Sequence, residues 1–424
     1  MPDKRLTVTT GLMLVWASGV CLGASIQVRP DPETIQLLVE GPKPGTNFAL
    51  VFDRSRAGIC GWYDLDDDPK MERNLAPTGP GHCFTLFQSQ AQIRLGGRNV
   101  DIMPGPAESL SLLEEHPERV VISVAGRLAK SDGLRPTEEF PKLIEMATGR
   151  QVPGNQLPRY EIRYTVYPTG AVYVQMVWDI RAVPLDLVTQ HSILANAATE
   201  QFLALNDWKD GRQPLDWPVS FLLHHSDLVK TDALLTPHLG RYVSDWLAQS
   251  MSSTNPPCNW FRSGFSLCEK PKQLREGRYS WEFLLHLEPG TAGDREAAFD
   301  ISEDYRHPDI LSMTEEGWGE LDINSQGDGN FDAYAERDGT YDILDGREGV
   351  RFGISGVKYP RFHPAFLVNG WEGPVPESIR MDGLVLVRKK DFNAFVEERK
   401  LLVQYLGVIV DRQARFEFLH RPGR

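Results

Sequence analysis

One stretch of this sequence limits the fold more than any other. Residues 158–183 read PRYEIRYTVYPTGAVYVQMVWDIRAV, two runs of alternating β-branched and aromatic residues around a Pro-Thr-Gly corner. Such runs on both sides of a three-residue loop are typical of a β-hairpin. The pairing that places apolar residues together sets Val166 opposite Val172, Tyr164 opposite Val174, Ile162 opposite Met176 and Tyr160 opposite Trp178. We expect this apolar face to point into the core.

The opposite face of the hairpin is polar. It carries Arg163 opposite Gln175, Thr165 opposite Tyr173, and Tyr167 beside the turn, because side chains of a strand alternate between faces. Aromatic rings and planar polar groups on a rigid sheet are what a sugar-binding surface requires. We therefore predict an open trough here, although an ordinary solvent-facing sheet has a similar composition.

Strand-like runs recur through the chain and predict an all-β, mostly antiparallel fold built from packed sheets. They lie at 35–39, 48–52, 84–95, 120–128, 278–287, 349–356, 383–387, 401–410 and 415–419. Helical patterns are short and cover 107–115 and 138–146, while 185–207 fits neither period.

The composition changes near Pro289, and 424 residues exceed what one core usually organises. Apolar alternation stops there and resumes near Arg347. We expect a large β-sandwich domain over 25–290, an acidic connecting segment over 291–346, and a small C-terminal β domain over 347–424.

The N-terminus has the order of a secretory signal. Lys4 and Arg5 precede an apolar run that ends in small residues at Ala24. We expect cleavage after Ala24 and a secreted or periplasmic protein without stable membrane insertion, because the run is shorter and more interrupted than a spanning helix. A membrane anchor is the alternative, and Ser18-Gly19-Val20 before Cys21 is a poor lipoprotein signal.

The net charge of −13 argues against nucleic acid as a partner, because an acidic surface repels phosphate backbones. With Cys21 removed, an even set of four cysteines remains, which suggests disulfides in an exported chain. Three connectivities exist, and the simplest joins Cys60 to Cys83 and Cys258 to Cys268. A zinc site is one alternative, but no Cys-x-x-Cys spacing supports it. Four unrelated buried thiols are the other alternative, which would be favoured over zinc if the chain is not exported.

The stretch GDGNFDAYAERDGTYDI, residues 327–343, has two interpretations. Asn324, Asp328, Asn330 and Asp332 fall near ligand positions of a calcium loop, but the twelfth position is Ala335 and not Glu. The alternative is a set of hairpin corners, at Asp328-Gly329, Asp338-Gly339 and Asp345-Gly346, with a strand at 340–343 between the last two. A Ca²⁺ ion is the one cofactor for which we expect a site.

This stretch, with HPAFLVNGWEGPVPESIRMDGLVLVRKKDFNAFVEERKLLVQYLGVI at 363–409, resembles the C-terminal region of secreted bacterial β-sandwich proteins of polysaccharide metabolism. The larger domain of that family is similar to polysaccharide lyases and galactose mutarotase-like sandwiches, which implies a supersandwich-like fold for 25–290. No catalytic motif of the family is matched position by position.

Lyase chemistry on a uronic acid requires a cation for the carboxylate and a base for the α-proton. Arg163 is our candidate for the first role and Tyr173 for the second, with His286 as a further catalytic candidate. The segment NPPCNWFRSGFSLC resembles a disulfide-closed loop whose Trp260 and Arg262 rim a groove, or else a hydrophobic plug. Tyr167 and Gln175 complete the predicted substrate-binding set.

The sequence therefore favours an exported protein that binds an acidic polysaccharide and cleaves it by β-elimination. The alternative is a non-catalytic carbohydrate-binding or cell-envelope protein of the same architecture. No nucleophile elbow, His-Glu-x-x-His pair, phosphate loop or dinucleotide fingerprint is present, and we find no acid pair to nominate for a glycoside hydrolase.

Overall fold

The computed structural model describes residues 23–76, 87–132, 136–137, 139–179, 187–197, 201–204, 221–225, 231–237, 245–252, 259–266, 278–289, 295–313, 318–323, 332–344 and 346–419. These residues form mostly antiparallel β-sheets with two α-helices, which confirms the predicted fold class. Within these ranges no helix is long and apolar enough to cross a membrane.

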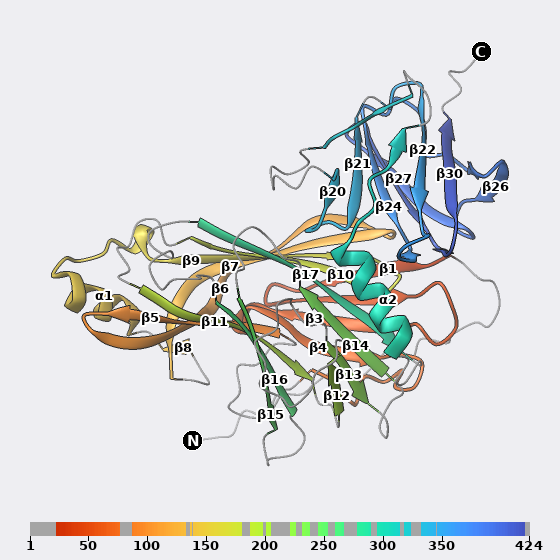
Figure 1. Ribbon diagram of the computed structural model, residues 1–424. Coiled ribbons are helices and arrows are strands. Elements are labelled where there is room, and N and C mark those ends of the chain that lie inside the picture. The colour runs from red at the N-terminus through yellow and green to blue at the C-terminus, as the bar shows by residue number, and fades with distance from the viewer. Residues whose placement is uncertain are drawn as a thin grey trace.

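A 13-stranded sheet forms the centre of the N-terminal half (Figure 1). Its order is β12-β13-β14-β17-β10-β9-β7-β6-β5-β11-β16-β15, with β8 paired to β7. The strands are β5 Phe87–Leu95, β6 Arg98–His116, β7 Arg119–Ser131, β8 Pro136–Thr137, β9 Arg159–Val166, β10 Ala171–Asp179, β11 Leu187–Ala197, β12 Gln201–Ala204, β13 Phe221–His225, β14 Thr231–Pro237, β15 Asp245–Ser252, β16 Asn259–Ser266 and β17 Arg278–Pro289.

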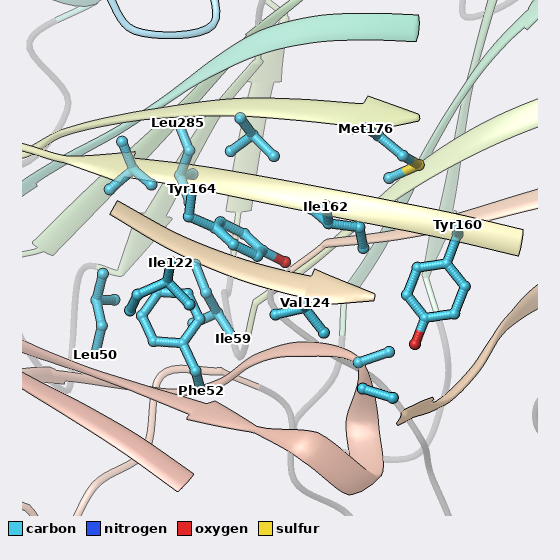
Figure 2. Packing of buried hydrophobic residues seen from close by; sticks show 14 of the residues in the cluster. Leu50, Phe52, Ile59, Ile122, Val124, Tyr160, Ile162, Tyr164, Met176 and Leu285 are labelled. Carbon is cyan, nitrogen blue, oxygen red and sulfur yellow. The ribbon is translucent and has the colours of Figure 1, made fainter. Parts of the chain in front are cut away.

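A four-stranded sheet packs against this large sheet. It runs in chain order through β1 Ser25–Pro30, β2 Thr34–Glu40, β3 Phe48–Asp53 and β4 Gly58–Asp64. Figure 2 shows the core between the two sheets, where Phe52 points toward Tyr164 with ring centroids 5.0 Å apart. The alternation of apolar residues on both sheets fills this layer, so the packing is that of a β-sandwich.

The C-terminal part consists of smaller sheets. One has the order β18-β22-β30-β25-β26, one has β19-β21-β24-β28-β27 with β20 on β21, and β23 pairs β29. The strands are β18 Ser312–Met313, β19 Glu320–Leu321, β20 Tyr334–Ala335, β21 Thr340–Leu344, β22 Gly349–Ser355, β23 Arg361–Phe362, β24 Ala365–Asn369, β25 Ser378–Met381, β26 Leu384–Val387, β27 Phe392–Glu397, β28 Lys400–Tyr405, β29 Val408–Ile409 and β30 Gln413–Leu419.

A second hydrophobic core joins these sheets to the large sheet. Its aromatic centre is Phe352, Phe366, Phe416 and Phe418, and the cluster extends to Tyr167 and Leu284 of the N-terminal half. Residues 291–346, which we expected to connect two domains, supply one helix and strands β18 to β21.

The helices are α1 Phe140–Thr148 and α2 Arg295–Arg306, with short 3-10 turns at Arg54–Arg56 and Gly154–Gln156. The prediction of a helix at 138–146 is confirmed by α1, whose C-cap residue Gly149 has a left-handed conformation. The predicted helix at 107–115 is wrong, since these residues belong to strand β6. Register shifts between Pro104 and Glu114 interrupt the alternation of β6, and such bulges disguise a strand in the sequence.

Candidate functional site

The hairpin of β9 and β10 has the predicted register. Val166 lies opposite Val172, Tyr164 opposite Val174, Ile162 opposite Met176 and Tyr160 opposite Trp178, and Arg163 lies opposite Gln175. The apolar face belongs to the sandwich core, as expected. The chain thus places the polar face on the other side of the sheet, where the C-terminal strands lie (Figure 1).

That polar face is covered by the corner at Asp338-Gly339, between β20 and β21. The Asp338 carboxylate accepts hydrogen bonds from Arg163 Nη2 at 3.0 Å and Thr165 Oγ1 at 3.1 Å. The Tyr167 hydroxyl donates to the main-chain carbonyl of Asp338 at 2.8 Å. Thr165 and Tyr167 are both 0% exposed, so the expectation of an open trough is wrong for this part of the face, whereas Arg163, Tyr173 and Gln175 are half-buried. The sugar-binding roles proposed for this face stay predictions.

Three guanidinium groups act on the Asp338 carboxylate at this contact. Burial by itself raises the pKa of Asp338, but the guanidinium groups of Arg163, Arg337 and Arg119 outweigh it and hold the pKa below its usual value. Arg119 in turn donates to both carboxylate oxygens of Glu114 at 2.6 Å. The aspartate is therefore ionised at neutral pH and fixes the C-terminal corner to the hairpin.

Gly339 permits the corner to approach the sheet. A Cβ atom at this position would lie 2.1 Å from Cζ of Tyr173, so only glycine lets the main chain rest on the tyrosine ring. Its φ of +65° also falls in the left-handed region. This confirms the hairpin-corner interpretation of Asp338-Gly339, and it explains why the corner needs this dipeptide.

A cavity of about 20 Å³ lies next to this contact, between the large sheet, α2 and the C-terminal strands. We call it the junction cavity. It is lined by Thr169, Ala171, Tyr173, Leu284, His286, Ile301, Asp304, Tyr305, Tyr334, Phe362 and His363. The structure thus brings together Tyr173 and His286, two of the three predicted catalytic residues, on the adjacent strands β10 and β17. Arg163 is not among the lining residues.

Burial shifts the pKa of both catalytic candidates in this cavity and that of Asp304. It lowers the pKa of His286 to about 4, so the imidazole is neutral at pH 7. It raises the pKa of Tyr173, which shares a hydrogen bond with Tyr334. Burial also raises the pKa of Asp304 to about 6, although Arg361 opposes this. The cavity therefore combines a neutral imidazole with protonated phenols.

Arg361 ties α2 to the C-terminal strands. Its Nη1 atom donates to Asp304 Oδ1 at 2.9 Å and to the His307 carbonyl at 2.7 Å, and Nε donates to the Ser355 carbonyl at 2.9 Å. The main-chain N–H of Phe362 also donates to Asp304 at 2.8 Å. These bonds close the side of the cavity that α2 forms.

The remaining predicted substrate-binding residues lie elsewhere. Gln175 donates to Glu282 at 3.0 Å, and Glu282 also accepts from Ser280 at 2.6 Å. Trp260 and Arg262 lie on strand β16, opposite Met251 and Gln249 of β15, so the predicted loop between the two cysteines contains a strand instead. The alternating residues of NWFRSGFS are the signal that we interpreted as a loop. The side chains of β16 lie outside the described residues.

The predicted calcium ligands Asn324, Asp328 and Asn330 lie outside the described residues. Asp332 is described, and its Oδ1 atom accepts a hydrogen bond from the main-chain N–H of Tyr334 at 2.9 Å. In the part of the chain that the structure describes, no group of three or more His, Cys, Asp or Glu side chains is arranged to hold a metal ion. The calcium site stays a prediction.

The cysteines do not form the predicted Cys60–Cys83 bridge in this structure, which has Cys60 as a free thiol. Burial, followed by the charge of Asp53, raises the pKa of Cys60 to about 11, so the thiol is protonated and unreactive at neutral pH. Cys83, Cys258 and Cys268 lie outside the described residues, and the second pairing stays a prediction.

Sequence reasoning missed Asp304, Tyr305, Tyr334 and His363 as cavity residues. The first three lie in the segment that we expected to be a connection. His363 has a φ of +50°, which is uncommon outside glycine, but the sequence gives no sign of it. Only the Tyr334 to Tyr341 stretch, with its aromatic residues around a corner, carried a signal.

In its all-β fold the chain resembles polysaccharide lyases and mutarotase-like proteins at low identity. A heparan sulfate lyase from Pedobacter heparinus is 10% identical, with 64% of this chain and 36% of that chain covered and a TM-score of 0.27. An aldose epimerase homologue from C. elegans is 9% identical, with 63% and 99% covered and a TM-score of 0.30. A chondroitin AC lyase mutant from Streptomyces coelicolor A3 is 11% identical, with 93% and 49% covered and a TM-score of 0.24.

The match thus spans little more than a third of the length of that heparan sulfate lyase. At these TM-scores we transfer no residue role from the solved structures. No protein-family model and no curated protein matches the chain.

Proposed function

We propose that this chain acts outside the cytosol on an acidic polysaccharide, and that β-elimination takes place at the junction cavity. The observation that supports this is the meeting of Tyr173 and His286 in one cavity, lined by residues from both halves of the chain. β-Elimination requires a base for the proton α to the uronic carboxyl group and an acid for the leaving oxygen. An imidazole and a phenol are suitable for these two roles.

The protonation states fit this division of roles. The neutral imidazole of His286 has a free electron pair with which to accept the α-proton. The phenol of Tyr173 keeps its proton at neutral pH and is able to give it to the leaving oxygen. Because Arg163 is paired with Asp338, the substrate carboxylate would be met by the phenols of Tyr305 and Tyr334.

The size of the cavity sets a condition on this proposal. About 20 Å³ holds one water molecule and not a sugar ring. A polymer would enter only if α2 and the C-terminal strands move away from β10 and β17. In this movement the hydrogen bond between Arg361 and Asp304 either breaks, or it holds so that α2 and the C-terminal strands move together. This opening is part of the proposed mechanism.

A specific observation favours a second candidate, the non-catalytic carbohydrate-binding or cell-envelope protein. The guanidinium that we assigned to the substrate carboxylate is bound to Asp338, and the neighbouring Thr165 and Tyr167 are buried. In this alternative, the junction is only a structural contact. A glycoside hydrolase remains less favoured, because among the described lining residues the cavity has one carboxylate, Asp304, where that chemistry requires two.

The test is incubation of the purified chain with a panel of uronic-acid polymers while the ultraviolet absorbance of unsaturated products is followed. We expect product from at least one polymer, and its loss in the variants Tyr173→Phe and His286→Gln. Met146→Leu, at an exposed position of α1, is the control that should keep full activity. Binding without unsaturated product in affinity electrophoresis would favour the second candidate, and neither binding nor product would refute both.

A further inference from the structure

The two residues before the first strand are integral parts of the fold. Gly23 and Ala24 precede β1, and Ala24 is only 4% exposed. Ser25, which follows them, is already paired with Glu40 of β2. The described chain is therefore packed before the position at which the sequence alone placed the end of the export signal.

Ala24 makes a buried hydrogen bond to the other end of the chain. Its main-chain carbonyl accepts from Nδ2 of Asn393 at 3.0 Å, across 369 residues of sequence. Asn393 lies on β27 and is 1% exposed. If the chain began at Ser25, this buried donor would lose its acceptor, and an unpaired buried amide is costly to leave without a partner.

Gly23 also lies against the C-terminal part of the chain. A Cβ atom at Gly23 would lie 2.2 Å from the main-chain oxygen of Lys389, which belongs to the turn just before β27. The neighbouring Arg388 forms an ion pair with Glu118, in the turn between β6 and β7, at 3.7 Å. Residues 23–24 thus lie in the contact between the C-terminal strands and the sandwich.

We propose that the mature chain keeps Gly23 and Ala24, so that the export signal is removed before Gly23 and not after Ala24. The sequence offers such a cut, because Ala17-Ser18-Gly19 has small residues at the two positions that signal cleavage requires. A signal peptidase would add water across the Gly19–Val20 peptide bond, leaving a carboxylate on Gly19 and an ammonium group on Val20. This inference rests on the export proposed above.

The retained residues then have a structural role. They join β1, at the edge of the four-stranded sheet, to β27 of the C-terminal sheet, so the first and last parts of the chain hold each other in place. The junction cavity lies between these same two halves. Cleavage after Ala24 would weaken this contact at its edge.

The direct experiment is to express the full-length chain in an exporting bacterium, isolate it from the periplasm or the medium, and determine its intact mass and N-terminal sequence. We expect a first residue at or before Gly23, with Val20 the specific expectation. A chain beginning with lipid-modified Cys21 would also keep both residues and support the inference. A first residue of Ser25 would overturn it and leave the export proposal intact. A chain found only in the cytosolic fraction and beginning at Met1 would refute the export proposal and, with it, this inference.

A second experiment measures the structural role without export. Chains that begin at Val20 and at Ser25 are released from a cleavable fusion tag and compared by thermal unfolding and hydrogen exchange. We expect the shorter chain to melt about 2 °C lower or more and to lose protection in 392–397. Asn393→Ala should lower the melting temperature of the longer chain and change that of the shorter chain much less. Equal melting and equal protection in the two chains would overturn the role that we assign to Gly23 and Ala24.

Discussion

The contact between Asp338 and Arg163 is the most informative place to perturb this protein. Asp338→Asn keeps the size of the side chain and an acceptor for Thr165 but removes the negative charge that faces Arg163 and Arg337. The Asp338 and Arg163 side chains are 12% and 27% exposed, so solvent screens their pairing only in part. Removing one partner of a buried ion pair costs about 3 to 5 kcal/mol. Because Arg163 is partly exposed, we expect a loss near the lower end, about 3 kcal/mol.

The assay is denaturant unfolding of the wild type, Asp338→Asn, Arg163→Met and the double variant. This cycle isolates the coupling between the two side chains, for which we expect at least ~1 kcal/mol. Glu372 and Arg399, an ion pair with both side chains more than half exposed, form the control cycle, with an expected coupling below ~1 kcal/mol. A coupling for Asp338 and Arg163 no larger than that of the control would refute the reasoning.

The stability that the ionised Asp338 side chain contributes depends on pH in a defined way. Burial raises the pKa of Asp338, but the nearby arginines reverse the effect and lower it below the ordinary value. A carboxyl group whose pKa is lowered on folding adds stability above its unfolded pKa and loses it as the pH falls through the folded value. The difference between the wild type and Asp338→Asn should therefore be constant above about pH 5 and shrink below about pH 4.

Three further predictions concern the residues around this contact. Gly339→Ala should lower the free energy of unfolding by about 1 to 3 kcal/mol more than Gly383→Ala, because both positions have positive φ but only Gly339 meets a tyrosine ring. Equal losses of stability in chemical denaturation would contradict the packing of Gly339 on Tyr173. Burial lowers the pKa of His286 from 6.5 to about 4, so between these pH values the unfolded chain binds more protons than the folded chain. The difference in free energy of unfolding between the wild type and His286→Gln should therefore fall by about 1.4 kcal/mol per pH unit on acidification in that window. Asp304, with a raised pKa, opposes this slope in each protein alike, so only the difference is diagnostic, and a flat difference would show that His286 is solvated. Without any reductant, Cys60 should react with maleimide after denaturation but not in the native chain. A disulfide-linked Cys60–Cys83 peptide in mass spectrometry would contradict the free thiol.

The β9–β10 hairpin was predictable because the sequence pattern that defines it lies within one short segment. Alternation over 160–178 and the corner at 168–170 define register and faces, and the structure has the same pairs. The same logic predicted a strand at 340–343 and a turn at Asp338-Gly339. Where bulges break the alternation in β6, the local signal failed and indicated a helix.

The junction was not predictable because its contacts are long-range. Arg163 and Asp338 are 175 positions apart, and alternation reports only that a face is polar, not whether another part of the chain covers it. A polar face paired with a charged corner has the same pattern as one that meets water. Tyr173 and His286 lie on strands with an alternating pattern and were predicted as candidates. Asp304 and Tyr334 lie in a segment without such alternation and were not predicted.

The central claim is that the C-terminal corner closes the polar face of the hairpin, and hydroxyl-radical footprinting with mass spectrometry tests it most directly. The account predicts that Tyr167, at 0% exposure, stays unmodified in the native chain and that the half-buried Tyr173 reacts slowly, while Met146 at 76% exposure and Phe299 at 39% react. Modification of both tyrosines at rates like those of the exposed residues would contradict the closure and restore an open trough.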